Sequence, residues 1–409
     1  MRTEPARLAA LLRERRGELL ILLTLLLLAT KAAFNIAYGL ITLAGLVLLI
    51  RRPRELLADP AVRLLGLLFL CLWLPILASL PDAANPARAW SNALQYPRFF
   101  LAGLYVTVLL GDPDRRDFLL KGVLAVTGFW VADALLQYFS GTDLFGYPYD
   151  RGQLTGMFYP KMRLGQLLAI LAPLVLEGLR RMAAGRPWVW LWLFPYTAVI
   201  LLSNKRAAWL MYAVALLLWA GHALLRGRLS WRLTAGLAAG AALTVALLLQ
   251  TSPALRGMTQ TAGGLLSGDL QRFDQATSHR VSLWQTALDM ARAHWVNGVG
   301  PRGYRKVYRD YARPGDFWIA HGASGQTHPH SLLLEIAAET GGIGLAGYLL
   351  FLLLLVRAGL RGADPPLVMT AFVAAMPFNV SNAFYGTYWS TLVWLFLPLA
   401  IASLPRSRR

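Results

Sequence analysis

Residues 331–356 read SLLLEIAAETGGIGLAGYLLFLLLLV, an apolar run of the length that a helix needs to cross a bilayer. Comparable runs recur from residue 18 to residue 403, and 56% of the chain is hydrophobic with a mean hydropathy of +0.48. This composition excludes an ordinary soluble domain and predicts an all-α polytopic membrane protein. The single cysteine, Cys71, lies in an apolar run, so no disulfide framework is expected and a small buried side chain is predicted.

The apolar runs predict twelve spans joined mostly by short segments. An N-terminal stretch with arginines before an apolar run is similar to a signal peptide, but a second apolar run follows it, so we expect a retained first span. The expected organisation is nine spans within residues 1–250, a mostly helical loop domain over 251–329 and three spans within 330–409. The predicted spans are 18–32, 34–50, 64–80, 98–110, 118–138, 164–179, 187–203, 207–225, 233–250, 331–356, 366–382 and 387–403.

The distribution of positive charge predicts the orientation of these spans. With the N-terminus in the cytoplasm, 23 of the 40 Lys and Arg residues fall on the cytoplasmic side, against eight in the short segments facing outward and nine in the long loop. Short cytoplasmic loops carry the positive excess in membrane proteins, so the long loop is expected to face outward, into the periplasm of a bacterium. The net charge of +19 is mostly this excess and does not imply nucleic-acid binding.

The cations that remain on the outward side indicate a ligand. Lys161, Arg163, Lys205 and Arg206 lie at the outer ends of predicted spans, and the long loop holds nine basic residues against five acidic ones. An outward basic cluster predicts an anionic ligand at the outer face of the membrane. The alternative is that single side chains anchor helix ends by extending their charges to the interface.

The long loop has its own predicted structure. Apolar residues at spacings of three and four predict an amphipathic helix over 280–296 that starts at Arg280, and a second short helix is expected through Tyr304, Tyr308 and Tyr311. The segment 322–326 is predicted to be flexible. The loop is rich in aromatic residues, which could stack on sugar rings, but we expect most of them to pack a small domain against the interface.

The end of the loop, THPHS at residues 327–331, is its most informative motif. Proline suits the first turn of a helix, so His330 is expected at the N-terminus of the following span. The positive end of a helix disfavours imidazolium and favours a nearby phosphate, which suits His330 as a general base. Ser331, Glu335 and Glu339 follow along one face, and Glu335 is expected to pair with an outward arginine or to orient a histidine. A lone histidine at a helix end is otherwise an interfacial polar residue.

Other motifs carry less weight. A zinc site made by His328, His330 and Glu335 is not favoured, because the spacing of two at a helix start is not a common ligand spacing. The letters GIGLAG at 342–347 match a dinucleotide fingerprint, but they lie in a predicted span without a preceding strand, so close helix packing is expected. The sequence holds no Walker-type phosphate loop and no Asp-x-Asp motif in the loop, which favours a lipid-linked donor over a nucleotide sugar.

Three segments resemble a known family. Residues 330–345 (HSLLLEIAAETGGIGL) resemble the signature at the end of the large periplasmic loop in the O-antigen ligase and polymerase superfamily. Residues 203–210 (SNKRAAWL) resemble a turn between two of its spans, and 278–284 (SHRVSLW) with 297–301 (NGVGP) resemble its arginine-helix-glycine segment. The sequence THPH at 327–330 is most similar to the lipopolysaccharide O-antigen ligases. The resemblance covers about residues 199–348; Ser331 departs from it, since asparagine is frequent there, which weakens any role for that side chain.

The resemblance implies transfer of a polysaccharide from undecaprenyl pyrophosphate to a hydroxyl of the lipid A–core oligosaccharide, at the periplasmic face of the inner membrane. It implies no metal, nucleotide or other cofactor, and no nucleic-acid partner. Guanidinium groups could stabilise the pyrophosphate that leaves, and an imidazole could deprotonate the acceptor, with inversion at the anomeric carbon. The residues expected in these roles are His330 as the base, Arg206 and Arg280 with Lys205 and Arg163 at the pyrophosphate, and His328, Glu335 and Glu339 as supporting groups.

Three alternatives stay open at this point. An O-antigen repeat-unit polymerase shares the layout and the donor and differs in its acceptor, and a protein O-oligosaccharide ligase differs in the same way. A lipid or sugar transporter belongs to another class, and its functional charges are expected near the middle of the membrane. Here the charges gather at the outer ends of the predicted spans.

Overall fold

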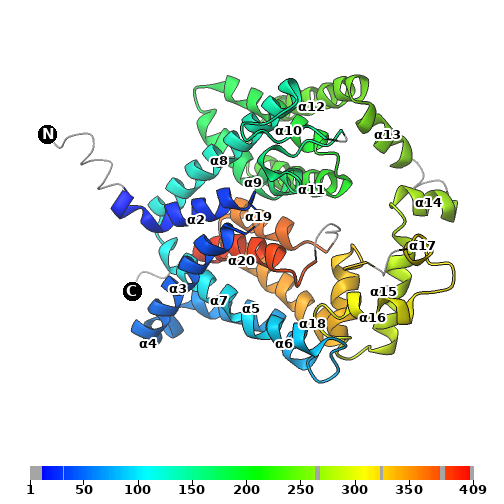
Figure 1. The fold of residues 1–409 in the computed structure, drawn as a ribbon. Coiled ribbons are helices and arrows are strands. Elements are labelled where there is room, and N and C mark those ends of the chain that lie inside the picture. The colour runs from blue at the N-terminus through cyan, green and yellow to red at the C-terminus, as the bar shows by residue number, and fades with distance from the viewer. Residues whose placement is uncertain are drawn as a thin grey trace.

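The computed structural model describes residues 12–30, 32–150, 152–262, 268–322, 326–377 and 383–405. These residues are helical, and they contain isolated bridges between Thr142 and Pro148 and between Asp150 and Gln153 but no strand. The helices, shown in Figure 1, are α2 (Arg16–Leu27), α3 (Phe34–Arg51), α4 (Pro53–Ala58), α5 (Pro60–Ala78), α6 (Pro86–Gln95), α7 (Pro97–Leu109), α8 (Pro113–Ser140), η1 (Gly156–Phe158), α9 (Leu164–Met182), η2 (Pro187–Trp192), α10 (Leu193–Leu202), α11 (Arg206–Leu225), α12 (Trp231–Thr251), α13 (Pro253–Ala262), α14 (Leu270–Ala276), α15 (Val281–Ala293), α16 (Tyr304–Tyr311), α17 (Phe317–Ala320), α18 (Leu332–Leu360), α19 (Pro365–Ala375) and α20 (Thr387–Ala402).

Each predicted span contains a helix, and six of these helices are long and apolar enough to cross a membrane: α3, α5, α8, α11, α12 and α18. The other predicted spans contain α2, α7, α9, α10, α19 and α20, which are shorter or carry more charge near one end. An all-α, multi-pass membrane protein is therefore confirmed. The number of twelve spans stays a prediction.

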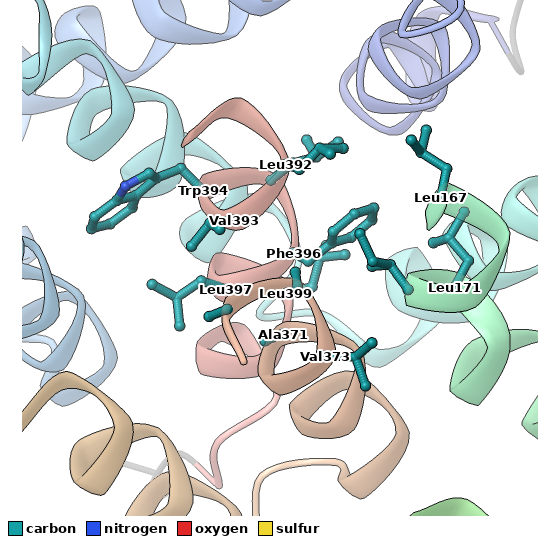
Figure 2. Close-up of a cluster of buried hydrophobic side chains, with 14 of the residues drawn as sticks. Leu167, Leu171, Ala371, Val373, Leu392, Val393, Trp394, Phe396, Leu397 and Leu399 are labelled. Atoms are coloured by element: carbon teal, nitrogen blue, oxygen red, sulfur yellow. The ribbon is translucent and has the colours of Figure 1, made fainter. Parts of the chain in front are cut away.

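Helix α20 lies at the centre of the helix bundle. Every residue from Tyr388 to Ala402 is buried. Figure 2 shows Phe396 of this helix on the side that faces Leu167 and Leu171 of α9, and Trp394 on the opposite side of the helix. Helices α7 and α19 pack along α20 from different sides, so the core of the protein is formed around one apolar helix.

Small residues bring the helix backbones close together. A side chain at Gly45 of α3 would overlap the Leu101 carbonyl of α7, and one at Gly347 of α18 would overlap the Cys71 carbonyl of α5. Van der Waals contact between backbones is a main source of helix association in a membrane, where lipid is as apolar as leucine. The expectation of close packing for the glycines at 342–347 thus holds at Gly347. Cys71 itself is half-buried in α5.

The predicted cytoplasmic segments gather at one end of the bundle, where cations are paired with carboxylates. The buried Glu18 lies 3.0 Å from Arg115, although the two residues belong to α2 and α8. Glu177 of α9 lies 2.8 Å from Arg180 and 2.9 Å from Arg181. Part of the positive charge at this end is therefore paired with carboxylates of the protein.

The predicted outward segments meet at the other end. The Asn92 side chain of α6 donates to the Tyr385 carbonyl at 2.9 Å, and the amide of Ala84 donates to the Val299 carbonyl at 2.9 Å. These contacts join loops that the charge pattern assigns to the same side. The structure thus supports the predicted alternation of the segments, whichever side of a membrane they face.

The long loop contains helices α13 to α17, of which α14 to α17 lie together at one edge of the molecule (Figure 1). The predicted helix 280–296 is α15, and the predicted short helix through the tyrosines is α16. Leu283, Met290, Tyr304 and Tyr308 form a second apolar core with Ala338 of α18. Most of the loop aromatics therefore pack a small domain, as expected. Residues 323–325 of the segment predicted to be flexible lie outside the described residues.

Helix α18 is not one continuous span, which corrects the prediction for 331–356. Gly341 has φ 64° and ψ −157°, which divides the helix into 332–340 and 342–360. The second part alone has the length of a bilayer span. At the break, the Gly342 amide donates to the Trp295 carbonyl at 2.7 Å, and the Val299 amide donates to the Ala338 carbonyl at 2.8 Å. The loop domain is thereby fastened to the first part of α18.

Candidate functional site

His330 stands directly before α18, in front of the N-cap residue Ser331. The helix therefore begins at Leu332, and the expectation that the proline at 329 lies in its first turn is wrong. His330 has φ 51°, a left-handed conformation, and its ring lies 4.1 Å from the ring of His328. The Nδ1 atom of His328 lies 3.0 Å from the Thr327 hydroxyl. The two imidazoles thus form a half-buried pair at the outward start of α18.

The other three histidines of the long loop take part in contacts within the loop domain. Such contacts indicate structural roles for these three histidines. Within the described part of the chain, no three His, Cys, Asp and Glu side chains gather as a metal site would require. The three contacts are His279 with Asp274 at 2.9 Å, His294 with the Tyr311 hydroxyl at 2.7 Å, and His321 with the Phe317 carbonyl at 2.7 Å.

Three cations from distant parts of the sequence form a cluster at the outward end, which we call the cation cluster: Lys205, Arg206 and Arg280. The Arg206 guanidinium donates to the Ala276 carbonyl and, at 3.3 Å, to the Ser278 hydroxyl, which ties the start of α11 to the turn before α15. Burial and the nearby Arg280 lower the pKa of Lys205. Burial and the nearby Arg206 lower the pKa of Arg280. Arg280 is therefore near both Lys205 and Arg206.

Among the residues that the structure describes, the cation cluster has no carboxylate within ion-pair distance. Among the described residues, no ion pair involves Lys205, Arg206 or Arg280, in contrast to the paired arginines at the opposite end of the bundle. Half-buried cations without counter-ions raise the free energy of the empty site, because each charge has lost part of its hydration. A bound anion would lower that free energy. The geometry therefore favours an anionic ligand with more than one charge.

The position of α15 brings the cation cluster and His330 to the same end of the loop domain. Leu283, near the start of α15, and Leu334, near the start of α18, pack in the same apolar core. Just after the end of α15, the Trp295 carbonyl accepts from the amide of Gly342 in α18. The two helices consequently run side by side in the same direction. Arg280 directly precedes α15 and His330 directly precedes the cap of α18, so both residues lie where this helix pair begins.

Arg163 lies beside this region but is held by an aromatic ring. Its guanidinium carbon lies 3.6 Å from the ring centroid of Tyr388, a cation–π contact. The start of α9 is close to the turn that carries Lys205, because a side chain at Gly165 would overlap Ser203. Arg163 is thus a neighbour of the cation cluster rather than a member of it. No sequence pattern marks Tyr388, which is one aromatic residue at the start of an apolar run.

The two glutamates of α18 have a structural role that differs from the prediction. The buried Glu335 accepts from the backbone amides of Phe384 at 3.0 Å and Tyr385 at 3.4 Å. The buried Glu339 accepts from the backbone amide of Arg302 at 2.8 Å. These hydrogen bonds go to backbone amides, and the expected pairing of Glu335 with an arginine side chain or a histidine stays a prediction. Both carboxylates hold backbone segments against the first part of α18, which carries His330.

Strained backbone marks the same region. Left-handed φ values at residues other than glycine cost about 1–3 kcal/mol each and gather at functional sites. Asn204 and His279 directly precede cations of the cation cluster, and His330 is the candidate base. Sequence patterns do not reveal such conformations in advance. Among the described residues they are Asn204, Ser278, His279, Arg302 and His330, all in predicted outward segments.

Comparison with known proteins is consistent with this site. Residues 191–349 match the model of a family described as O-antigen ligase, and the match includes the cation cluster and His330. It confirms the resemblance to the O-antigen ligase superfamily over this part of the chain. The family covers O-antigen ligases and related polymerases, which are glycosyltransferase-like enzymes with lipid-linked polysaccharide substrates. No curated protein matches the chain.

Proposed function

We propose, from the O-antigen ligase match and the arrangement of His330 with the cation cluster, that this protein is an O-antigen ligase. It transfers a polysaccharide from undecaprenyl pyrophosphate to a hydroxyl of the lipid A–core oligosaccharide. The reaction takes place at the periplasmic face of the inner membrane, with the loop domain 251–329 facing the periplasm. It inverts the anomeric centre and needs no metal.

The observation that carries the proposal is the set of half-buried cations without carboxylate partners. Among the described residues, no ion pair neutralises Lys205, Arg206 or Arg280. Burial and the nearby Arg280 lower the pKa of Lys205, and burial and the nearby Arg206 lower the pKa of Arg280. A diphosphate carries several negative charges and enough oxygen atoms to accept from more than one guanidinium group. The cation cluster therefore fits the leaving group of a polyprenyl pyrophosphate donor.

The cation cluster would act mainly in the transition state. As the bond between the anomeric carbon and the phosphate oxygen breaks, its electron pair stays on the pyrophosphate, where negative charge increases. Fixed guanidinium groups stabilise this charge without reorganising, and removing one such donor typically costs about 10²–10³ in kcat. The bond that Arg206 donates to the Ala276 carbonyl fixes its guanidinium in place before substrate arrives.

His330 would act on the acceptor. Its imidazole removes the proton of the acceptor hydroxyl as the oxygen attacks the anomeric carbon opposite the leaving pyrophosphate, so one C–O bond forms as the other breaks. The ring of His328 packs on His330 and restricts its orientation. Arg163, held over Tyr388, would contribute long-range attraction to the donor rather than a direct contact.

A repeat-unit polymerase is the nearest alternative, since it uses the same donor and the same leaving group. A protein O-oligosaccharide ligase differs only in its acceptor, and a lipid or sugar transporter would not cleave the donor. Transfer to lipid A–core with purified components separates these functions, because only the ligase joins the polysaccharide to that acceptor.

The test is an assay with purified protein in detergent, lipid-linked glycan, rough lipopolysaccharide and a chelator. Wild-type protein is expected to form the ligated product, and His330→Ala is expected to lose it. His321→Ala is the matched control, because His321 is an exposed histidine of the same loop domain and should leave transfer unchanged. Product formed at the wild-type rate by His330→Ala would refute the role of this residue. Polymer formed without any ligated product would favour the polymerase.

A further inference from the structure

A second group of arginines lies at the outward end, apart from the cation cluster. Arg88, Arg302 and Arg305 line a cavity of about 220 Å³ together with Asn85. Among the described residues, none of these arginines forms an ion pair. Three guanidinium groups around one cavity form a strongly positive site with room for a phosphate-sized group and its hydration.

The backbone around this cavity is fixed by specific contacts. Arg302 has φ 65°, a left-handed conformation, and its amide donates to the buried Glu339 at 2.8 Å. The Asn85 side chain accepts from the Arg88 amide at 3.3 Å and so caps α6. The cavity is therefore a built feature of two loops rather than a chance meeting of mobile surface side chains, and part of its cost is stored as backbone strain.

The helix that carries Arg88 has the character of an interfacial helix. On α6, Ala89 and Ala93 are buried, whereas Trp90 is 52% exposed and Leu94 is 73% exposed. Exposed tryptophan beside apolar side chains is typical of the level where lipid headgroups meet the acyl chains. A ligand that reaches this cavity from the membrane would place its anionic headgroup among the arginines and its acyl chains beside α6.

The cavity is connected to the site around His330. Asn92 of α6 donates to the Tyr385 carbonyl at 2.9 Å, and Glu335 of α18 accepts from the Tyr385 amide. Glu339, four residues further along the same helix, holds Arg302. The arginine cavity therefore borders the helix segment 332–340, which His330 precedes.

We propose that Arg88, Arg302 and Arg305 bind a phosphate group carried by a membrane lipid in the outward leaflet. Arginine binds phosphate in two-point contacts that a carboxamide cannot replace. On the proposed function, from which this extension follows, the lipid is the phosphorylated glycolipid acceptor. Its phosphate would be held here while its sugar hydroxyl reaches His330, and the donor diphosphate would occupy the separate cation cluster.

The experiment measures lipid binding without turnover, so it does not depend on transferase activity. Wild-type protein and the double variant Arg88→Gln with Arg305→Gln are titrated with a phosphorylated lipid A–core glycolipid, with its dephosphorylated form, and with phosphatidylglycerol in neutral carrier lipid. Lys306→Gln with Arg309→Gln is the matched control, since it removes the same charge from α16 at exposed positions outside the cavity. The melting temperature of each variant checks that it is folded.

The cavity variant is expected to bind the phosphorylated glycolipid at least about tenfold more weakly, the equivalent of losing one charge-assisted hydrogen bond. Its binding of the dephosphorylated form should be unchanged, and the control should bind like wild type. Equal losses in both double variants, or no loss in either, would overturn the proposal. A tenfold loss for phosphatidylglycerol alone would support the site and identify an ordinary phospholipid as its ligand. If the double variant does not fold, Arg305→Gln alone gives the same comparison.

A failure of the proposed function would be distinct from these results. It would appear as wild-type protein that binds both lipids but forms no ligated product.

Discussion

The break in α18 at Gly341 allows a sharp prediction. Gly341→Ala introduces a side chain at φ 64° and ψ −157°, a conformation open essentially to glycine alone, and its Cβ would overlap the Val296 carbonyl. The backbone must then rotate away from the loop. Rotation would break the bonds that the amides of Gly342 and Ile343 donate to Trp295 and Val296, at 2.7 and 3.1 Å.

The magnitude follows from these contributions. The backbone strain costs about 3 kcal/mol, at the upper end for one such residue. Each backbone hydrogen bond contributes about 1 kcal/mol. Local opening between the loop domain and α18 should therefore become easier by about 3–5 kcal/mol, which raises the opening equilibrium constant by about 10² to 4 × 10³.

Hydrogen–deuterium exchange of the amides at residues 342 and 343 measures this opening directly. Gly221→Ala is the matched control, because Gly221 lies within α11 and a side chain there meets nothing within 4 Å. The control should exchange at these amides like wild type, while Gly341→Ala should exchange about 100-fold faster and show impaired transfer. Exchange within about threefold of the control would refute the view that the break fastens the loop domain.

Three further predictions concern the cation cluster and the reaction. Arg280→Gln should lower kcat/KM for transfer by about 10²–10³. Arg280→Lys should recover only part of this loss, because an ammonium group cannot make the forked contact of a guanidinium. Equal rates for the wild type and both variants would contradict this prediction. The pKa of Lys205 is lowered in the empty site, and a bound anion favours the charged form of this side chain. The affinity for inorganic pyrophosphate should therefore fall as the pH rises through a value below 10.5, where Lys205 loses its charge in the empty site. Lys205→Arg should remove that decline, and a decline of the same size in the variant would exclude Lys205 as its cause. Treatment with a chelator should leave the transfer rate unchanged, and restoration of a lost rate by added divalent metal would show that a metal is required.

The sequence predicted the presence of the helices well, because apolar runs of bilayer length have few other stable forms in a membrane. It did not predict the break in α18. That break depends on Gly341 lying against residues 296–298, a contact between segments more than forty residues apart, and a glycine in an apolar run otherwise indicates helix packing. The role of Glu335 was missed for a similar reason, since its partners are backbone amides near residue 384 that no side-chain pattern reveals.

Some parts of the candidate site could be predicted from the sequence, and others could not. His330 was found from a local motif, and Arg206 and Arg280 from their unusual outward position and a resemblance. The arginine cavity was not found, because Arg88 and Arg302 each look like an ordinary surface cation until the fold brings them together. Local chemistry can be predicted from neighbouring residues, whereas a cavity formed by distant loops depends on tertiary contacts.

The burial of α20 has a consequence for biosynthesis. This helix fills the centre of the bundle, yet the ribosome makes it after α5 and α7, which pack against it. Those earlier helices are therefore inserted in the bilayer before the helix that forms their common core has been synthesised. A nonsense codon before residue 387 would leave that assembly permanently hollow, and we expect quality-control proteases to remove it.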